Sequence, residues 1–323
     1  MKQKCVVALA LPDEIIQSLE ARYKVVAWAG SDAMSRQQLA DALTDAQGLL
    51  CALSTPIDVS IIDGATALKV ISTVSVGVDH IDIAAATRRG IPVGHTPGIL
   101  VDSTADLAVA LMLATTRRIA EADQWVRDGQ WTQGWQSDLL LGTDLSQATV
   151  GLVGLGPIGE AVARRLRGFG CKLVGWNRTP RVIEGLEPMA LDQVFAEADV
   201  VSLHTALTEE TRHIASRERL ARMRPGATLI NTGRGPLVDE QALIDELTSG
   251  RLRAGLDVFY QEPLPANHPL MNLRNVVLLP HVGSATDATR VAMLGRALDN
   301  LDVGMRGEAL SWCANPAVYQ VDP

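Results

Sequence analysis

The sequence predicts an α/β protein made of two doubly wound parallel-sheet domains, and three observations lead to this fold class. The chain has 323 residues, which is room for about two domains of ordinary size. Short runs rich in β-branched residues alternate with helical stretches over residues 4–95, and a second alternation runs from 149 to about 280. Such alternation is typical of parallel sheets covered by helices. A glycine-rich turn follows the first strand of the second alternation.

The first alternation predicts five strands with helices between them. Ser35 stands where one of these helices needs an N-cap. Further on, the run Ser-Thr-Ala-Asp at 103–106 has the spacing of a capping box, which predicts that a long apolar helix occupies residues 107–119. The five strands are expected at residues 6–10, 25–28, 48–53, 70–72 and 92–94.

The second alternation predicts six strands, and the last helical stretch of the sequence follows them at residues 285–305. Its strands are expected at residues 149–153, 171–176, 200–203, 228–231, 255–258 and 276–279. Open α/β sheets place their sites at the carboxyl ends of the strands. We therefore expect functional residues to follow these strands directly.

Residues 154–159 read Gly-Leu-Gly-Pro-Ile-Gly and lie between a predicted strand and a helical pattern. This context is that of the dinucleotide-binding turn of Rossmann-like domains. The first glycine would permit the tight turn, the second would let a pyrophosphate approach the backbone, and the third would let the helix pack closely. The helix N-terminus would attract the phosphates. The predicted cofactor contacts of the turn are Gly154, Gly156, Pro157, Ile158 and Gly159.

The next strand indicates which dinucleotide is preferred. It ends at Asn177, Arg178 and Thr179, about 20 residues after the glycines, where NAD-binding domains carry Asp or Glu for the ribose hydroxyls. No acid stands there, and an arginine suits a 2′-phosphate because it forms bidentate, charge-assisted hydrogen bonds. Arg181 follows closely. The sequence therefore predicts NADP(H) in preference to NAD(H).

These motifs set the expected division of the chain. We expect residues 1–99 with 287–323 to form a substrate-binding (catalytic) domain, and 100–286 to form the dinucleotide-binding domain. An active-site cleft is expected between the two, because small substrates favour such clefts.

Composition excludes several classes of protein. Apolar residues make up 47% of the chain, and no run approaches the roughly 18 apolar residues that span a membrane. The net charge is -8 without a basic stripe, which argues against nucleic acid as a partner. Four scattered cysteines and no grouped histidines indicate a reducing compartment and no metal site. A cytoplasmic protein is expected.

Three segments at predicted strand ends, together with the glycine turn, carry a resemblance to a known family. They read Asn-Thr-Gly-Arg-Gly at 231–235, Gly-Leu-Asp-Val-Phe-Tyr-Gln-Glu-Pro at 255–263, and Leu-Leu-Pro-His-Val-Gly-Ser-Ala-Thr at 278–286. The sequence resembles the D-isomer-specific 2-hydroxyacid dehydrogenase family over nearly its whole length. The stretch 261–270 is most similar to that of the glyoxylate/hydroxypyruvate reductases within it.

The resemblance implies that Arg234, Glu262 and His281 are the catalytic residues, and the chemistry of these side chains agrees. Arg234 could grip a carboxylate and polarise a carbonyl. His281 could supply a proton, since histidine titrates near neutral pH. Glu262 could orient the imidazole and favour its charged form. Without the resemblance, a buried ion pair joining two loops would be an equally good interpretation of Glu262 and His281.

The resemblance also implies further contacts. For the substrate these are Val76, Gly77, Arg234, Ser284 and Trp135. For the cofactor they are Thr104, His204, Thr205, Thr232, Asp257, His281 and Gly283. Asp257 could instead cap the turn that follows it. Trp135 would enter the neighbouring subunit's site in a homodimer, although a place in the dimer core fits it equally well.

The function implied is NADPH-dependent reduction of small 2-oxo acids, namely glyoxylate and hydroxypyruvate, to D-2-hydroxy acids, with His281 as the proton donor. A 2-ketogluconate reductase is the alternative within the enzyme class. The alternative outside it is a dinucleotide-sensing corepressor, which would carry partner-binding extensions beyond the two domains.

Overall fold

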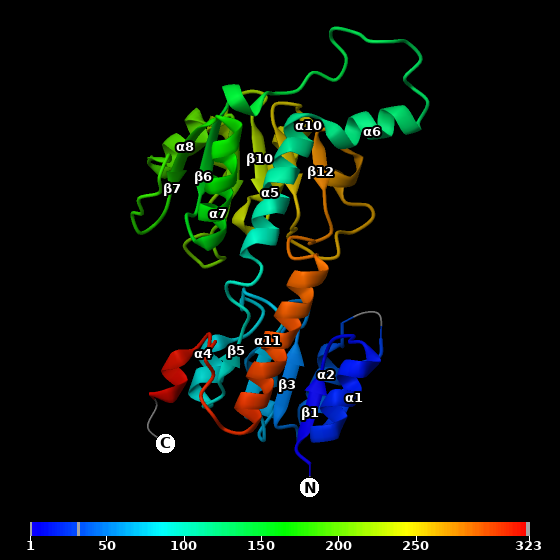
Figure 1. The fold of residues 1–323 in the computed structure, drawn as a ribbon, viewed down its shortest axis with the longest axis vertical. Coiled ribbons are helices and arrows are strands. Elements are labelled where there is room, and N and C mark those ends of the chain that lie inside the picture. Colours follow the sequence, from blue (N-terminus) through cyan, green and yellow to red (C-terminus); the bar gives the residue numbers. More distant parts are fainter. Residues whose placement is uncertain (1, 31–32, 321–323) are drawn as a thin grey trace. The chain divides into compact units, whose positions relative to one another are not determined.

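The computed structural model describes residues 2–30 and 33–320, and the chain divides into two compact units (Figure 1). Unit 1 comprises Met1–Leu100 and Thr286–Pro323, and unit 2 comprises Val101–Ala285. Each unit has its own parallel sheet with helices packed on both faces. The predicted fold class of two parallel-sheet α/β modules is therefore confirmed.

Unit 1 has a five-stranded sheet in the order β2-β1-β3-β4-β5. Buried side chains of α2, α3 and α4 form the core on one face, and those of α1 and α11 form the core on the other. The elements are β1 (Lys4–Val7), α1 (Asp13–Arg22), β2 (Lys24–Ala27), α2 (Arg36–Leu43), β3 (Gly48–Cys51), α3 (Val59–Gly64), β4 (Val70–Thr73), α4 (Ile83–Arg88), β5 (Val93–Gly94) and α11 (Asp287–Met305).

Unit 2 has a seven-stranded sheet in the order β12-β11-β10-β9-β6-β7-β8. Helices α5 and α7 pack on one face, and α8, α9 and α10 pack on the other. The elements are α5 (Val101–Thr116), α6 (Ile119–Arg127), β6 (Thr149–Val153), α7 (Pro157–Leu166), β7 (Lys172–Trp176), β8 (Glu187–Pro188), α8 (Leu191–Glu197), β9 (Val200–Leu203), α9 (Arg217–Arg222), β10 (Thr228–Asn231), α10 (Glu240–Thr248), β11 (Arg253–Leu256) and β12 (Val276–Leu278).

The strand order of unit 2 fixes where its site lies. The chain runs outward from β6 through β7 to β8, then returns to the other side of β6 and continues from β9 to β12. This reversal is the topological switch point at which dinucleotides bind in open α/β sheets. Because all strands are parallel, the loops after β6, β9, β10, β11 and β12 gather at one edge.

The local predictions succeed where patterns are regular and fail at two places. The hydroxyl of Ser35 caps α2, as expected. The predicted capping box is wrong, since α5 already begins at Val101 and ends at Thr116. Within that helix the hydroxyl of Thr104 donates to the carbonyl of Gly283, at 3.2 Å, instead of capping. The two-residue strand β8 was not predicted, because an exposed Glu-Pro pair has no strand pattern.

The four cysteines are free thiols; Cys5 and Cys51 are buried, and Cys171 and Cys313 are half-buried. In the part of the chain that the structure describes, no helix combines the length and apolarity that a membrane crossing requires.

Candidate active site

The turn between β6 and α7 requires glycine at two positions. Gly154 has a φ of 97°, and a Cβ there would lie 2.7 Å from the carbonyl carbon of His204. A Cβ on Gly159 would lie 2.1 Å from the carbonyl oxygen of Gly154, so the third glycine lets the helix pack against the turn itself. Nothing lies within 4 Å of a Cβ built on Gly156. The backbone there is open to a ligand, in front of α7, which begins at Pro157.

Several buried polar atoms beside this turn have no hydrogen-bond partner among the residues that the structure describes. They lie at the carboxyl ends of β9 and β10, and they are the hydroxyls of Ser202, Thr205 and Thr232 and both ring nitrogens of His204. Such atoms are costly unless a ligand or ordered water satisfies them. Burial lowers the pKa of His204 to about 4, so its ring is neutral at pH 7. A dinucleotide, with its many donors and acceptors, fits this part of the site. Sequence reasoning missed Ser202, which has no motif of its own.

The loop after β7 is tied to the glycine turn. Asn177 accepts a hydrogen bond from the backbone N–H of Leu155 at 2.9 Å and donates to the carbonyl of Thr179 at 2.7 Å. Arg178 is exposed and pairs with Glu210 at 2.6 Å. Arg181 donates to the carbonyl of Leu155 and pairs with Glu160 at 3.3 Å. Two arginines therefore stand at the strand end where a ribose-binding acid would otherwise stand.

Glu262 and His281 meet across two loops that follow neighbouring strands. Oε2 of Glu262 lies 2.7 Å from Nδ1 of His281, and Oε1 accepts from the backbone N–H of Phe259 at 3.0 Å. Burial alone would raise the pKa of Glu262. The hydrogen bonds from His281 and Phe259 and the charges of His281 and Arg234 outweigh it, so the pKa lies below its ordinary value. The carboxylate is therefore ionised at neutral pH and can stabilise an imidazolium.

The loop that carries His281 is anchored on Asp257, which follows β11 and is buried. The carboxylate of Asp257 accepts from the backbone N–H groups of Val282 and Gly283 at 2.8 and 2.9 Å. Its carbonyl accepts from the N–H of His281 at 2.9 Å. Burial raises the pKa of Asp257, against the hydrogen bonds that lower it. These contacts are made with the loop after β12, whereas the sequence had suggested that Asp257 could cap the turn that follows it directly in the chain.

Arg234 follows β10 in a loop that Asn231 holds. The Asn231 side chain accepts from the N–H of Gly233 at 3.0 Å and donates to the carbonyl of Arg234 at 2.8 Å. A Cβ on Gly235 would lie 2.0 Å from the carbonyl carbon of Phe259. This glycine therefore lets two backbone segments pack together. Asn231 was not predicted as a site residue, because an asparagine at the end of a strand can form hydrogen bonds with many different loop groups.

The remaining predicted residues lie in different places. Thr104 and Gly283 are hydrogen-bonded to each other, and Ser284 lies in the turn after His281. The indole of Trp135 is 88% exposed. Val76 and Gly77 belong to unit 1.

The loop of unit 1 that contains Val76 and Gly77 is held through its carbonyl groups. Nδ1 of His95 lies 3.0 Å from the carbonyl oxygen of Val76, and the hydroxyl of Ser75 donates to that of Gly77 at 2.8 Å. Across the described ranges, the backbone N–H groups of Val76 and Gly77 have no protein acceptor.

Comparison with known proteins agrees with this geometry. Residues 109–283 match the family described as D-isomer specific 2-hydroxyacid dehydrogenase, NAD binding domain. A glyoxylate reductase of Thermofilum pendens is 45% identical over 329 residues, which cover 100% of this chain and 97% of that protein. A glyoxylate reductase/hydroxypyruvate reductase of Mus musculus is also 45% identical, over 89% of each chain.

Solved structures give the same result. An NADPH-dependent glyoxylate/hydroxypyruvate reductase of Sinorhizobium meliloti, in complex with NADP and malonate, superposes with a TM-score of 0.86 at 32% identity, and the match covers 98% of each chain. The fold and site thus define an oxidoreductase with an NAD(P)-binding domain. The chain belongs to the D-isomer-specific 2-hydroxyacid dehydrogenase family.

Proposed function

We propose that this chain reduces small 2-oxo acids, glyoxylate and hydroxypyruvate, to D-2-hydroxy acids with NADPH. The observation that carries the proposal is the 2.7 Å pair of Glu262 and His281, which stands in the NAD(P)-binding unit and within the electrostatic reach of Arg234. Relatives named glyoxylate reductase and glyoxylate reductase/hydroxypyruvate reductase, at 45% identity, support the choice of substrates.

His281 would donate the proton that the reduced carbonyl oxygen takes up. Its Nδ1 is occupied by Glu262, so Nε2 is the ring atom left to face a substrate. A carboxylate on Nδ1 fixes the ring orientation and favours the charged imidazole, which is the form that can donate. The bound nicotinamide would supply the hydride. In the oxidation direction the neutral imidazole would accept the proton.

Arg234 would bind the substrate carboxylate and polarise its carbonyl. A guanidinium forms bidentate hydrogen bonds with carboxylates, and Asn231 fixes the loop that carries this one. We propose the N–H groups of Val76 and Gly77 as a second carboxylate anchor, since successive backbone N–H groups form anion-binding concavities. Ser284 would contact the substrate from the turn after His281.

The cofactor would lie along the carboxyl edge of the unit 2 sheet. The backbone at Gly156 and the first turn of α7 would receive its pyrophosphate. Thr104, His204, Thr205, Thr232 and Asp257 are proposed to contact its remaining polar groups. Arg178, with Asn177 and Thr179, would bind the 2′-phosphate of NADP(H), because no carboxylate occupies the end of β7.

We further propose a homodimer in which Trp135 contacts the neighbouring subunit. The indole of Trp135 is 88% exposed and that of Trp131 is 59% exposed. Exposed aromatic side chains of this size are typical of interfaces. Size-exclusion chromatography with light scattering, on the chain and on Trp135→Ala, tests this assignment.

A steady-state screen tests the substrate assignment. Glyoxylate, hydroxypyruvate, pyruvate, 2-ketogluconate and phosphite would each be measured with NADPH and with NADH. The proposal expects the largest kcat/KM for glyoxylate or hydroxypyruvate with NADPH. A larger kcat/KM for 2-ketogluconate would support the alternative enzyme. Dinucleotide binding without turnover of any of these compounds would support a dinucleotide sensor and overturn the proposal.

A further inference from the structure

Three successive carbonyl groups of the loop after β4 are bound, and the two N–H groups between them are open. The carbonyl of Ser75 accepts from the N–H of Thr96 at 2.9 Å, and the carbonyl of Val76 lies 3.0 Å from Nδ1 of His95. The carbonyl of Gly77 accepts from the hydroxyl of Ser75 at 2.8 Å. Among the residues that the structure describes, the N–H groups of Val76 and Gly77 have no acceptor.

Peptide geometry makes each of these carbonyl contacts orient an N–H group. The peptide bonds of this loop are trans. A trans peptide bond is planar, and its carbonyl and N–H point in opposite directions. The contact of Thr96 with the carbonyl of Ser75 therefore orients the N–H of Val76. The contact of His95 with the carbonyl of Val76 orients the N–H of Gly77 in the same way.

His95 is the side chain that acts on the N–H of Gly77. Its Nδ1 must carry a proton, because a carbonyl oxygen can only accept. A hydrogen bond to a carbonyl also polarises the peptide group, so the N–H of the same group becomes a stronger donor. The His95 contact therefore sets both the direction and the strength of this N–H as a donor.

The backbone on both sides of the His95 ring is held by α11 and by the segment that follows it. The N–H of His95 donates to the carbonyl of Trp312 at 3.1 Å, and its carbonyl accepts from the amide of Asn300 at 3.0 Å. The carbonyl of Pro97 accepts from Arg296 at 2.6 Å, and this guanidinium lies 4.3 Å from the centre of a Trp312 ring. The imidazole is thus attached to a fixed support.

A separate chain of hydrogen bonds fixes the carbonyl of Gly77. The hydroxyl of Ser75 uses its one proton on this carbonyl, so the hydroxyl of Thr73, 2.8 Å away, donates to the Ser75 oxygen. Nε2 of His80 lies 3.1 Å from the Thr73 oxygen. Both hydroxyl residues are buried. Loss of the His95 contact would therefore free one peptide group and not the whole loop.

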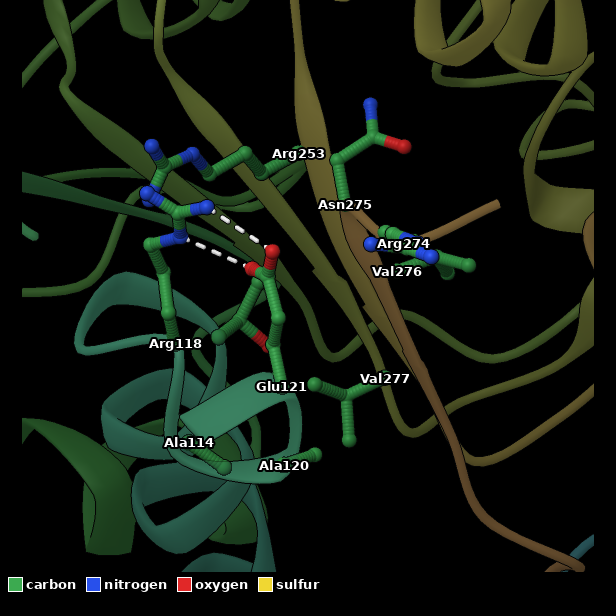
Figure 2. A pocket seen from close by; sticks show the side chains of 10 residues that line it. Ala114, Arg118, Ala120, Glu121, Arg253, Arg274, Asn275, Val276 and Val277 are labelled. Carbon is green, nitrogen blue, oxygen red and sulfur yellow. Dashed lines mark hydrogen bonds and ion pairs between the residues drawn. The ribbon is translucent and has the colours of Figure 1, made fainter. Parts of the chain in front are cut away.

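Two other side-chain hydrogen bonds show what distinguishes His95. The hydroxyl of Ser72 donates to the carbonyl of Ala297 at 2.7 Å, but the N–H of that peptide group is engaged within α11. At the junction of α5 and α6, Nε and Nη2 of Arg118 donate to the two oxygens of Glu121, each at 2.8 Å (Figure 2). Neither contact has an open backbone donor behind it, whereas the His95 contact does.

We propose that His95 is a positioning residue, which orients the N–H of Gly77 toward the carboxylate of the 2-oxo acid. This inference rests on the proposed function, in which the N–H groups of Val76 and Gly77 bind that carboxylate. The carboxylate does not react, so its contacts stabilise the bound substrate and the transition state alike. His95 should therefore act on KM and leave kcat close to that of the parent.

Steady-state kinetics with glyoxylate and hydroxypyruvate test the inference, together with calorimetric titration of the NADPH-loaded protein with oxamate. Oxamate is a carboxylate of similar shape that takes no hydride, so it reports binding without turnover. His95→Leu removes the donor and should raise the KM for both substrates and the Kd for oxamate by about three- to tenfold. The kcat and the KM for NADPH should stay at their parent values.

Two further variants separate the donor from the bulk of the ring. His95→Asn places an amide N–H the same number of bonds from the backbone as Nδ1, and it should restore KM and Kd to within about twofold of the parent. His95→Gln carries its amide farther out, where Nε2 stands, and should behave like His95→Leu. It also serves in place of His95→Leu if circular dichroism shows that the leucine variant does not fold.

Ser72→Ala is the matched control within unit 1. It removes a buried hydrogen bond to a backbone carbonyl, so it should lower the urea midpoint of unfolding. It should leave the KM for glyoxylate and the Kd for oxamate unchanged. A rise in these constants equal to that of His95→Leu would mean that loss of stability alone weakens binding, and would overturn the inference.

The outcomes distinguish this inference from the proposed function. Parent-like KM and Kd in both His95→Leu and His95→Gln would overturn the role of His95, while turnover by the parent would leave the proposed function standing. Failure of His95→Asn to restore binding would also overturn that role. A parent chain that reduces no 2-oxo acid would overturn the proposed function and this inference together.

Discussion

Asp257 holds the backbone of His281 from the neighbouring strand end: the N–H of His281 donates to the Asp257 carbonyl at 2.9 Å. His281 has a φ of 54°, in the left-handed region that costs a non-glycine residue about 1–2 kcal/mol. The Asp257 carboxylate binds the next two N–H groups along the chain and offsets this cost. The position of the candidate proton donor thus depends on a carboxylate that need not touch the substrate.

Asp257→Ala should therefore damage catalysis through the His281 loop. Two backbone N–H groups would lose their acceptors, at roughly 1–3 kcal/mol each if they stay buried. We expect kcat/KM to fall at least tenfold while circular dichroism stays close to that of the parent. Asp257→Asn keeps one acceptor oxygen, so its kcat/KM should lie between those of the parent and of Asp257→Ala. Parent-like kcat/KM in Asp257→Ala would show that the loop holds its shape without this anchor.

Cofactor preference should depend on Arg178 and on its partner. Arg178→Ala should reduce the ratio of kcat/KM for NADPH over NADH by roughly 5- to 30-fold, since a hydrogen-bonded charge at an exposed position contributes less than a buried one. Glu210 pairs with Arg178 at 2.6 Å and would compete with the phosphate. Glu210→Gln should therefore lower the KM for NADPH by about two- to fivefold and leave the KM for NADH unchanged. Equal use of both cofactors by the parent enzyme would refute the assignment.

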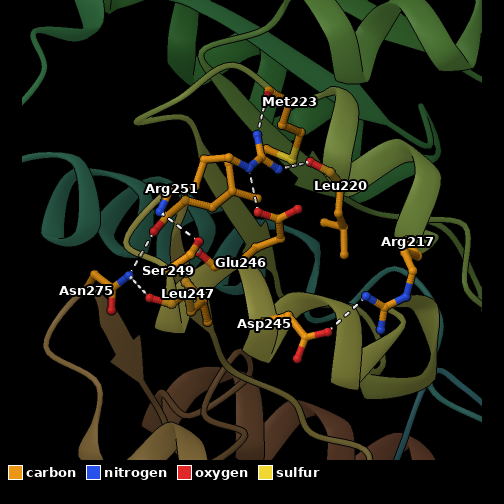
Figure 3. Close-up of polar contacts among 10 residues, drawn as sticks. Arg217, Leu220, Met223, Asp245, Glu246, Leu247, Ser249, Arg251 and Asn275 are labelled. Carbon is orange, nitrogen blue, oxygen red and sulfur yellow. Dashed lines mark hydrogen bonds and ion pairs between the residues drawn. The ribbon is translucent and has the colours of Figure 1, made fainter.

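Arg251 should matter for stability and not for chemistry. Its guanidinium donates to the carbonyls of Leu220 and Met223 near the end of α9 and pairs with Glu246 of α10 (Figure 3). Arg251→Ala removes the donor of the Met223 carbonyl and the partner of the Glu246 carboxylate, while the Leu220 carbonyl keeps the N–H of Met223. We expect a loss of about 2–4 kcal/mol in the free energy of unfolding, measured in urea. Arg251→Lys keeps the positive charge but not the planar guanidinium with its several donors. Its loss in the free energy of unfolding should therefore be smaller than that of Arg251→Ala. Equal unfolding midpoints for the two variants would mean that the hydrogen bonds contribute little.

His204 should make the protein less stable in mild acid. Burial lowers its pKa to about 4 in the folded chain, whereas an unfolded histidine titrates near 6.5. Between these values the unfolded state binds more protons, so the stability that is present above pH 6.5 is lost as the pH falls towards 4. At pH 5 the loss from one such group is about 2 kcal/mol. His204→Gln should show a smaller difference between urea midpoints at pH 7 and pH 5, and an unchanged difference would contradict the burial argument.

Periodicity and the glycine spacing predict most of the fold, because short buried strands have an unambiguous pattern. The predicted strand at 149–153 coincides with β6, and those at 200–203 and 228–231 coincide with β9 and β10. The positions of Arg234, Glu262 and His281 follow from their places after β10, β11 and β12.

The supporting contacts could not be predicted in the same way. The contacts of Asn231 depend on which backbone groups its folded loop brings near it, and the pair of Arg178 with Glu210 joins two loops that lie apart in the sequence. A single sequence carries no signal for such distances.

The central claim is that His281, paired with Glu262, moves the proton in both directions. It is tested by kcat/KM for reduction and for oxidation from pH 5 to 10 in the parent, Glu262→Gln and Arg234→Ala. Because the pKa of Glu262 lies below its ordinary value, its carboxylate stays charged over this range. The titration of His281 should then be what gives kcat/KM for reduction and kcat/KM for oxidation opposite dependences on pH.

The account predicts that reduction falls and oxidation rises as the pH increases through a shared midpoint. Glu262→Gln should move both midpoints to lower pH, because the imidazolium loses its partner, and Arg234→Ala should lower both rates without that shift. His281→Ala should abolish both profiles. Near-normal activity of His281→Ala on every 2-oxo acid, or a midpoint that Glu262→Gln leaves in place, would contradict the mechanism.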